Sequence, residues 1–494
     1  MLVITPLLYY SLLSLSFIVT LKLLLQRRKF KNLPPGPSIS LPIIGNLHNI
    51  NLPLHRSLHN LSQKYGKIFT LWFGSSRVVV ISSQTLLQQC LTKHDVDLSN
   101  RPRFLTGKYL FYNYTSLDSA PYGDHWRNLR RIITLDILST QRLNSFVGSR
   151  RSETLKLIIK LAKDTSERFT RVELRTRLTD MTFEIMTKMV AGDAEEGKKF
   201  KEMINEMMPL FGASNMGDFV PLLRLFDFDG LVKRMKDIGK RGDSFLQGIV
   251  EEIRSGKHGD NNMLQHLLTL QKSQPDYYSD EIIKGLVQGM FLAGTDTTAV
   301  TLEWAIATLL NHPNILKKAK DELNTQIGYD RLVEESDIPN LSYIQNIIYE
   351  TLRLYSPAPL LLPRFSSNEC NIEGFTIPRD TIVLINAWAI QRDPETWSDA
   401  SCFKPERFEK EGEANKLIAF GFGRRGCPGI GLAHRTMALS LGLLIQCFEW
   451  KRLNDEEVDM TENKIGVVTQ KLNPLEAMCK ARPIINKVIQ ESSV

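Results

Sequence analysis

A ten-residue run near the end of the chain carries the strongest chemical signal in the sequence. Residues 420–429 read Phe-Gly-Phe-Gly-Arg-Arg-Gly-Cys-Pro-Gly, and an apolar run from Ile430 to Phe448 follows. Glycine lets a backbone turn tightly and approach a flat cofactor closely, and the N–H groups at the start of a helix favour a thiolate over a thiol. A lone cysteine before a helix is also often a small buried hydrophobe. The run therefore predicts either a thiolate ligand at Cys427 or a core cysteine.

A second group of reactive side chains stands midway along an apolar-periodic stretch, Asp280–Asn311. Its residues are Ala293-Gly294-Thr295-Asp296-Thr297-Thr298. Glycine alone costs a helix about 1 kcal/mol, so a local opening of the helix is expected here. An acid beside a hydroxyl can deliver protons to a reacting oxygen, although on its own such a pair is more often a local cap.

Two further pairs combine helical spacing with charge. Glu350 and Arg353 stand three residues apart, and Trp126 and Arg130 stand four apart, so each pair shares one helix face. The spacing of Glu350 and Arg353 fits a buried ionic network and a solvent-facing pair equally well.

The elements that must position these side chains are mostly helical, with a minor β region. Two β-rich runs, Ile68–Phe73 and Val78–Ile81, flank Gly74 and predict a hairpin. A second strand-like region spans Ile372–Ala387. Apolar periodicity predicts five long helices, over Thr154–Lys163, Leu174–Val190, Gly230–Arg254, Asp280–Asn311 and Tyr343–Tyr355.

Composition indicates a large folded protein. The 494 residues are 43% hydrophobic, so the chain can bury a sizeable core. The net charge of +8 suits an anionic membrane surface or an acidic protein partner. No stretch interleaves basic with aromatic residues, so we expect no nucleic-acid partner. The six cysteines show no framework spacing, which indicates a reducing compartment.

The N-terminus predicts a membrane anchor. Only Lys22 is charged between Leu2 and Leu25, and a basic cluster from Arg27 to Lys31 follows. A bilayer core needs roughly 20 apolar residues in a helix, and basic residues stay on the cytosolic side. We therefore predict a transmembrane anchor at 2–25, a basic and proline-rich linker at 26–37, and a cytosolic domain at 38–494.

The ten-residue run resembles the cytochrome P450 signature Phe-x-x-Gly-x-Arg-x-Cys-x-Gly, and Phe420, Gly423, Arg425, Cys427 and Gly429 fill its defined places. The resemblance implies a single large P450-type domain that holds haem b, with Cys427 as the iron ligand. It implies that Asp296 supplies protons, that Thr297 orients oxygen, and that Ala293 and Gly294 lie beside the haem. It also implies propionate contacts from Trp126, Arg130, Arg364 and Arg425, and a buried network of Glu350, Arg353 and Arg407.

The chain further resembles the plant group that contains isoflavone 2′- and 3′-hydroxylases. The resemblance rests on Phe30–Pro37, Asn100–Phe104, Phe111–Tyr114 and Glu350–Leu362. It implies that Phe104, Phe111, Phe291, Leu361 and Val467 contact a flat phenolic substrate. About half of the aromatics near this region are expected to pack in the core instead. The chain departs from the group after Gly192, where it is shorter.

The predicted function is a monooxygenase of the endoplasmic reticulum membrane. It would insert one oxygen atom from O2 into an apolar or phenolic molecule, with electrons from NADPH through a separate flavin reductase and with membrane lipid as a further partner. Two alternatives remain at this point: a haem-thiolate isomerase or dehydratase that needs no oxygen, and a non-catalytic membrane haem protein. The pair Asp296–Thr297 argues against the first, because such an enzyme has no use for proton delivery to oxygen.

Overall fold

The computed structural model describes most of the chain from residue 32 to residue 485. The described ranges are 32–165, 168–192, 195–211, 216–220, 223–224, 227, 230–256 and 262–485, with a few positions between 9 and 21. Most of the predicted anchor at 2–25 and the first half of the linker at 26–37 lie outside the described residues. Among those described, one helix, Ile430–Cys447, is long and apolar enough to cross a membrane, and 72% of it is buried inside the protein.

The described residues divide into two compact units. The first comprises residues 1–105, 214–232 and 360–390, and the second comprises 106–213, 233–359 and 391–494. Each unit is therefore assembled from three separate stretches of chain. The predicted bounds of a single domain at 38–494 stay a prediction.

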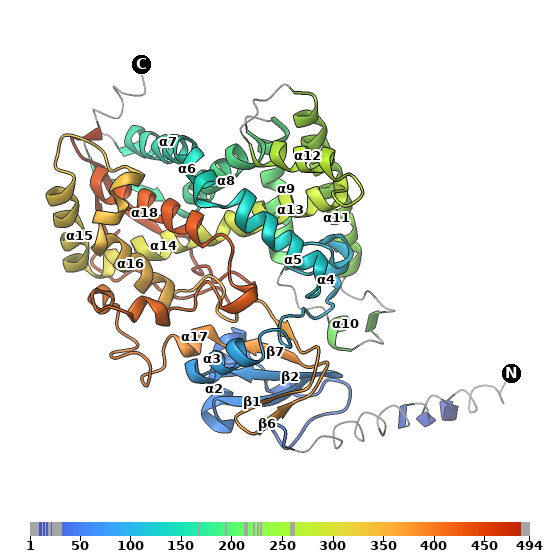
Figure 1. Cartoon of the computed structure of the whole chain (residues 1–494). Helices are drawn as coiled ribbons and strands as arrows, with labels where there is room; N and C mark the ends of the chain where they lie inside the picture. The colour runs from blue at the N-terminus through green and yellow to red at the C-terminus, as the bar shows by residue number, and fades with distance from the viewer. Residues whose placement is uncertain are drawn as a thin grey trace. The chain divides into compact units, whose positions relative to one another are not determined.

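The first unit is built around a four-stranded sheet with the order β1-β2-β7-β4. The hairpin of β1 (Ile68–Phe73) and β2 (Ser76–Ile81) is antiparallel, and its register pairs Ile68 with Ile81. This confirms the predicted hairpin, and strands β6 and β7, given next, confirm the second predicted strand region. The other elements of this unit (Figure 1) are β4 (Arg364–Phe365), β5 (Cys370–Ile372), β6 (Phe375–Ile377), β7 (Ile382–Ile385), η1 (Leu47–Asn49), α2 (Leu54–Tyr65), α3 (Gln84–Lys93), α10 (Met216–Phe219) and α17 (Ala387–Ile390).

The second unit is mostly helical. Its longer helices are α5 (Asp124–Arg131), α6 (Thr140–Ser145), α7 (Val147–Thr165), α8 (Arg175–Ala191), α9 (Glu195–Phe211), α11 (Leu231–Arg254, whose first turn falls at the unit boundary), α12 (Met263–Ser273), α13 (Asp280–Gly294), α14 (Asp296–Asn311), α15 (Pro313–Gln326), α16 (Ser342–Leu354) and α18 (Ile430–Cys447). Shorter elements are α4 (Leu105–Tyr109), η2 (Tyr112–Tyr114), η3 (Ile132–Ile137), η5 (Glu335–Asn340), η6 (Pro405–Glu409), η7 (Glu413–Lys416) and η8 (Gly423–Arg425). A three-stranded sheet, β3-β9-β8, joins β3 (Thr170–Glu173), β8 (Phe448–Lys451) and β9 (Glu476–Ala481).

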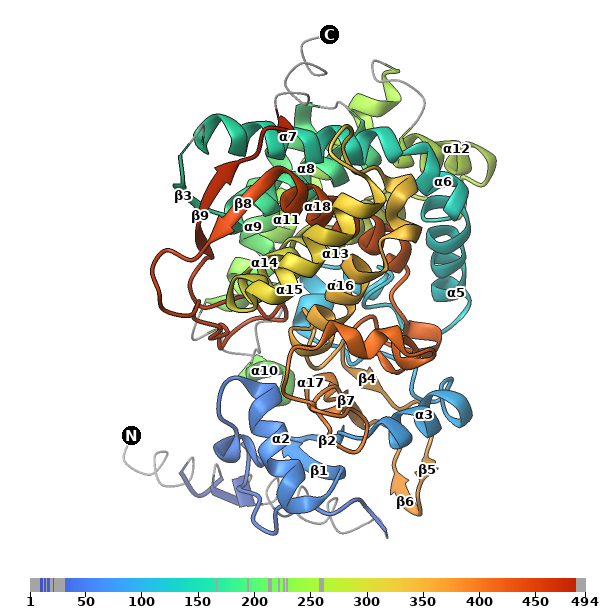
Figure 2. The same cartoon turned by 90° about the vertical axis from the view of Figure 1, so that its left-hand side faces the viewer.

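Three helices form the core of the second unit. α14, α16 and α18 contact one another and lie side by side in Figure 2. Most residues of α14 are buried, and so are nearly all of those of α18 after its first turn. A helix that is apolar on nearly every side is buried in the core of a large protein, and α18 is buried in this way. Its burial accounts for a length and apolar composition that would also suit a membrane span.

The long predicted helix Asp280–Asn311 is interrupted. It divides into α13 and α14 at Thr295, whose φ of −85° and ψ of −75° depart from regular helix geometry. Ser279 begins the first segment by accepting a hydrogen bond from the Ile282 N–H. The predicted local opening is confirmed, and it falls between Gly294 and Asp296.

Candidate active site

The loop before α18 folds back on itself. The Cys427 N–H donates to the Phe420 carbonyl at 2.8 Å, and the Gly426 N–H donates to the Gly423 carbonyl at 3.0 Å. Gly421 and Gly423 adopt φ of +69° and +68°, a region in which a side chain is strained. Two glycines of the ten-residue run are therefore required by the turn that brings Cys427 to the start of α18.

Cys427 is accessible to solvent and yet surrounded by protein. The residue is exposed, but burial raises the pKa of its thiol, against the opposing effects of the Gly429 N–H and the charge of Arg130. An accessible side chain whose surroundings still desolvate it lies in a recess rather than on an open surface. The helix-start N–H expected from the sequence is present at Gly429, but burial outweighs it. A thiolate here needs a further positive centre, and a bound metal ion deprotonates a coordinating thiol outright.

The surroundings of Cys427 fit a flat apolar cofactor. Phe422 and Ile430 flank the sulfur along the chain, and 42% and 44% of their surfaces are exposed. A Cβ added at Gly429 would lie 3.8 Å from the Cys427 sulfur. Large apolar side chains left exposed close in sequence to an accessible cysteine are what a porphyrin face would cover.

The break between α13 and α14 presents the predicted acid and alcohol. The Thr297 hydroxyl donates to the Ala293 carbonyl at 2.7 Å. Asp296 is buried, and burial raises the pKa of its carboxyl, with the charge of Arg175 opposing the shift. A buried carboxyl with a raised pKa holds a proton at a higher pH than an exposed one, as proton delivery requires.

The two small residues before the break differ in their surroundings. Ala293 is exposed although its neighbours Phe291 and Leu292 are buried. Gly294 has a packing reason of its own, since a Cβ there would lie 2.6 Å from the Met186 sulfur on α8. The contact of both residues with haem stays a prediction.

Trp126, Arg130 and Arg425 converge on the loop before α18. Arg425 lies over the Trp126 ring at 4.3 Å from its centroid and donates to the Ala120 carbonyl at 2.6 Å. Arg425 and the Trp126 ring N–H both donate to the Leu117 carbonyl at 3.1 Å. Arg130 donates to the Gly426 carbonyl, one residue before Cys427. The structure brings the three side chains together, and their propionate contacts stay predictions.

Arg364 belongs to the first unit. Its guanidinium is buried and lies 3.1 Å from the Asp95 carboxylate. Burial lowers the pKa of Arg364, and Asp95 opposes that shift. A propionate contact from Arg364 stays a prediction.

Glu350, Arg353 and Arg407 form a buried ionic network. The Glu350 carboxylate accepts from Arg353 at 2.7 Å and from Arg407 at 3.0 Å. The side chains of Glu350 and Arg353 have no exposed surface. The remaining Arg353 donors reach the Gln391, Ala400 and Cys402 carbonyls. The solvent-facing alternative left open by the spacing is therefore wrong.

The five predicted substrate contacts are distributed over both units. Phe104 packs edge-to-face on Phe219, with 5.9 Å between ring centroids, in the first unit. Leu361, also in that unit, adopts a left-handed φ of +52°. In the second unit Val467 is half-buried.

The two remaining aromatic residues pack in the second unit. Phe111 contacts Phe211 edge-to-face at 5.1 Å. Phe291 has no exposed surface and lies between Phe183 and Phe200. In this structure Phe291 belongs to the core, which agrees with the expectation that many aromatics here pack rather than bind. Substrate contact by all five residues stays a prediction.

A charged cluster beside Asp296 was missed from the sequence. Arg175 on α8 lies 3.0 Å from the Glu303 carboxylate on α14 and donates to the Lys471 carbonyl at 2.7 Å. Glu303 also accepts from the Leu475 N–H at 2.8 Å. The signal that could have revealed the cluster is Glu303 itself, a lone acid within the otherwise uncharged stretch Thr297–Asn311.

Comparison with known proteins places this geometry in context. The family model for cytochrome P450 matches residues 34–476. An isoflavone 3′-hydroxylase of Medicago truncatula is 60% identical over 498 residues, covering 97% of this chain and 99% of that protein. Isoflavone 2′-hydroxylases of Glycyrrhiza echinata and Medicago truncatula are 57% and 56% identical, and they cover 99% and 97% of this chain and 100% and 98% of their own lengths.

Proposed function

Because this chain belongs to the cytochrome P450 family and is a haem b monooxygenase that uses electrons from NADPH, we propose that it hydroxylates isoflavones or closely related flat phenolic molecules on an aromatic ring. The observation that carries the proposal is its similarity over nearly the full length to isoflavone hydroxylases of two plants. No other substrate class is named among these three relatives.

The residues of the second unit would divide the work as follows. Cys427 would hold the iron, and Trp126, Arg130 and Arg425 would hold the propionates. A thiolate-bound haem iron supplies the activation of dioxygen and favours O–O cleavage. Asp296, whose carboxyl is buried with a raised pKa, would pass protons toward the reaction site. Thr297 would orient the reacting oxygen through its hydroxyl.

We propose that the enzyme is anchored in the endoplasmic reticulum membrane by residues 2–25, with the catalytic part in the cytosol. The support is the apolar run followed by the basic cluster at 27–31. A separate NADPH-dependent flavin reductase would deliver the electrons. Arg127, Arg131 and Arg424 could contribute a basic surface for it, and Arg127 and Arg424 both lie over the Tyr122 ring. A plain solvated face accounts for these three arginines equally well.

Consumption of oxygen and NADPH, measured with the full chain and a plant reductase, tests the proposal. Isoflavones should give a substrate-binding shift in the haem spectrum and a product hydroxylated on an aromatic ring. Flavones, fatty acids and terpenes provide the comparison. A response to fatty acids alone would overturn the phenolic assignment and leave the monooxygenase assignment standing.

A further inference from the structure

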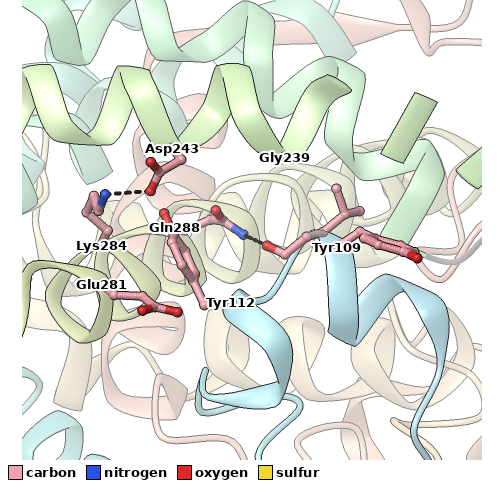
Figure 3. A pocket seen from close by; sticks show the side chains of 8 residues that line it. Tyr109, Tyr112, Gly239, Asp243, Glu281, Lys284 and Gln288 are labelled. Atoms are coloured by element: carbon pink, nitrogen blue, oxygen red, sulfur yellow. Dashed lines mark hydrogen bonds and ion pairs between the residues drawn. The ribbon is translucent and has the colours of Figure 1, made fainter. Parts of the chain in front are cut away.

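A polar pocket is lined by residues other than those assigned to the iron and to proton delivery. It encloses about 360 Å³ and is lined by Tyr109, Leu110, Tyr112, Gly239, Asp243, Glu281, Lys284 and Gln288. Figure 3 shows Glu281, Lys284 and Gln288 projecting from α13 and Asp243 from α11, with the Tyr112 ring between them. All of these residues belong to the second unit. None belongs to the Cys427 loop or to the Asp296–Thr297 pair.

Close backbone approaches shape this pocket. A Cβ at Gly239 on α11 would lie 2.3 Å from the Tyr109 carbonyl oxygen, so only glycine allows this contact. A Cβ at Gly285 on α13 would lie 3.4 Å from the Tyr112 ring. The Gln288 amide donates to the Leu110 carbonyl at 2.7 Å. The segment 109–112 is therefore held against both helices, and the pocket is a built feature of the fold.

The inner part of the pocket holds buried polar groups. Gln288 and Lys284 are only 3% and 7% exposed, and Lys284 forms an ion pair with Asp243 at 2.5 Å. The Tyr112 hydroxyl is buried beside Asp243 but makes no hydrogen bond of acceptable geometry within the described part of the chain. Burial and the Asp243 charge raise the pKa of Tyr112, so this hydroxyl stays protonated. Leaving such a group unpaired costs about 1–3 kcal/mol, which a ligand could recover.

The charges of the lining restrict what the pocket can hold. Two carboxylates against one ammonium disfavour an anion. A small cation would compete with Lys284, which already occupies Asp243. Most small-molecule pockets are lined mainly by apolar side chains, whereas Leu110 is the single aliphatic residue in this lining.

A neutral molecule with several hydroxyl groups satisfies these restrictions. Hydroxyls both donate and accept, so they match the Glu281 and Asp243 carboxylates and the Tyr112 hydroxyl. The volume lies near the lower end of the usual range of about 300–1,000 Å³ for ligand pockets. We propose that this pocket binds a neutral polyhydroxylated group of the size of one sugar unit, either as a free sugar or as the sugar of a phenolic glycoside.

Binding experiments with the full haem-loaded chain in lipid nanodiscs test this proposal, because many detergents carry sugar head groups. The probes are methyl β-glucopyranoside, an isoflavone β-glucoside and the corresponding isoflavone, each followed by calorimetry and saturation-transfer NMR. Tyr112→Phe removes only the unpaired hydroxyl, and Glu281→Ala removes an exposed carboxylate at the start of α13. Tyr329→Phe and Asp276→Ala are matched controls at exposed positions away from the pocket lining.

Each pocket variant should weaken binding of the sugar-bearing probes about tenfold, equivalent to about 1.4 kcal/mol, while both controls bind as the wild type does. If methyl glucoside binds and is weakened, the pocket takes a free sugar. If only the isoflavone glucoside binds and is weakened, the pocket takes the sugar of a glycoside. The proposal is wrong if neither sugar-bearing probe binds, or if both pocket variants bind them as the wild type does. The haem spectral shift caused by the sugar-free isoflavone reports on the proposed function separately.

Discussion

Burial raises the pKa of both ionisable side chains to which the chemistry is assigned, Cys427 and Asp296. The same physical cause has opposite consequences for the two residues. A raised pKa suits Asp296, because an acid that delivers protons must hold one near neutral pH. It disfavours a free thiolate at Cys427, so a thiolate there would depend on a bound iron, as proposed above.

Replacing Cys427 tests the iron ligand. Cys427→Ala should abolish the thiolate-specific absorbance of the reduced carbon monoxide complex, because the iron loses its sulfur ligand. Cys447→Ala, at the far end of α18 and fully buried, should leave the absorbance unchanged. Persistence of the thiolate spectrum in Cys427→Ala would remove the basis of the site.

The pH dependence of stability tests the buried acid. A carboxyl whose folded pKa is raised above the unfolded value of about 3.9 contributes stability below that value and loses it as pH rises through the folded pKa. Asparagine has no carboxyl to titrate, so Asp296→Asn does not lose stability in this way as the pH rises. The Tm difference between Asp296→Asn and the wild type should therefore increase with pH above about 4 and become constant above the folded pKa.

Thermal unfolding across the pH range measures this difference. Asp276→Asn at an exposed position is the control. A pH-independent difference for Asp296→Asn would show that Asp296 is not shifted.

At the scale of single residues, the sequence predicted what is local and missed what is distant. The Cys427 loop closes through hydrogen bonds within ten residues, so its sequence contains most of the information that shapes it. The contact between Arg175 and Glu303 joins residues 128 positions apart. Spacing carries no information about such a pair, because only the packing of α8 on α14 brings it together.

Among the secondary-structure elements, the interruption between α13 and α14 lies directly beside Asp296 and Thr297, the two residues proposed to handle protons and oxygen. Most of the surrounding helix is buried and regular, yet Thr297 uses its hydroxyl to bond the Ala293 carbonyl four residues back. Such back-bonding weakens or bends a helix. The interruption therefore places a hydroxyl and a carboxyl at one defined point of a rigid element.

Replacing Thr297 tests the role of this interruption. Thr297→Ala should retain haem and substrate binding but release more hydrogen peroxide per NADPH consumed, because the reacting oxygen loses its positioning hydroxyl. Thr308→Ala removes a similar back-bonded hydroxyl, which donates to the Trp304 carbonyl at 2.7 Å further along α14. It should leave the ratio of peroxide to NADPH unchanged. An unchanged ratio in Thr297→Ala would exclude Thr297 from orienting the reacting oxygen.

The ionic network between α16 and η6 makes a strong stability prediction. Glu350→Gln would leave Arg353 and Arg407 buried without a counter-charge. Breaking a buried charged network costs about 3–5 kcal/mol, so the folded protein should be lost at a much lower temperature. Glu206→Gln breaks an exposed pair with Arg241 and should change the Tm little. Equal Tm values for both variants would contradict a structural role for Glu350.

The regular helices and the hairpin could be predicted because their signals are local. The predicted Leu174–Val190 and Tyr343–Tyr355 correspond to α8 and α16 within one residue at each end. The sheet of β3, β8 and β9 was missed. Thr170 on β3 pairs with Cys479 on β9, some 300 residues further along the chain. Strands this short show no clear sequence pattern of their own, because their formation depends on such distant partners.

At the scale of the whole molecule, each compact unit is made of three separated stretches. Residues 360–390 supply β4 and β7, which complete the sheet begun by β1 and β2. Parallel pairing of β2 with β7 joins residues near 80 to residues near 384. Pairing over such separations is slow to form. Because the sheet needs β7, the first unit cannot be completed before most of the chain has been synthesised.

The orientation of the chain at the membrane is a prediction at this scale. Deleting residues 2–25 should release much of the protein from membranes into the soluble fraction. Asn113, which lies in a glycosylation sequence within η2, should carry no glycan if the catalytic part faces the cytosol. Fractionation and glycosidase treatment measure both outcomes. A glycan on Asn113 would reverse the proposed orientation.

The hydrogen bond from Thr297 to the Ala293 carbonyl also fixes which way the Thr297 hydroxyl donates. A hydroxyl owns a single proton, and here that proton is committed to the backbone. Toward its open side the oxygen can only accept. Threonine in a helix is divided between two χ1 rotamers because of this backbone bond. A rotation about the Cβ–Oγ bond would turn this proton away from the Ala293 carbonyl, and residue 297 would then donate toward its open side instead of accepting there.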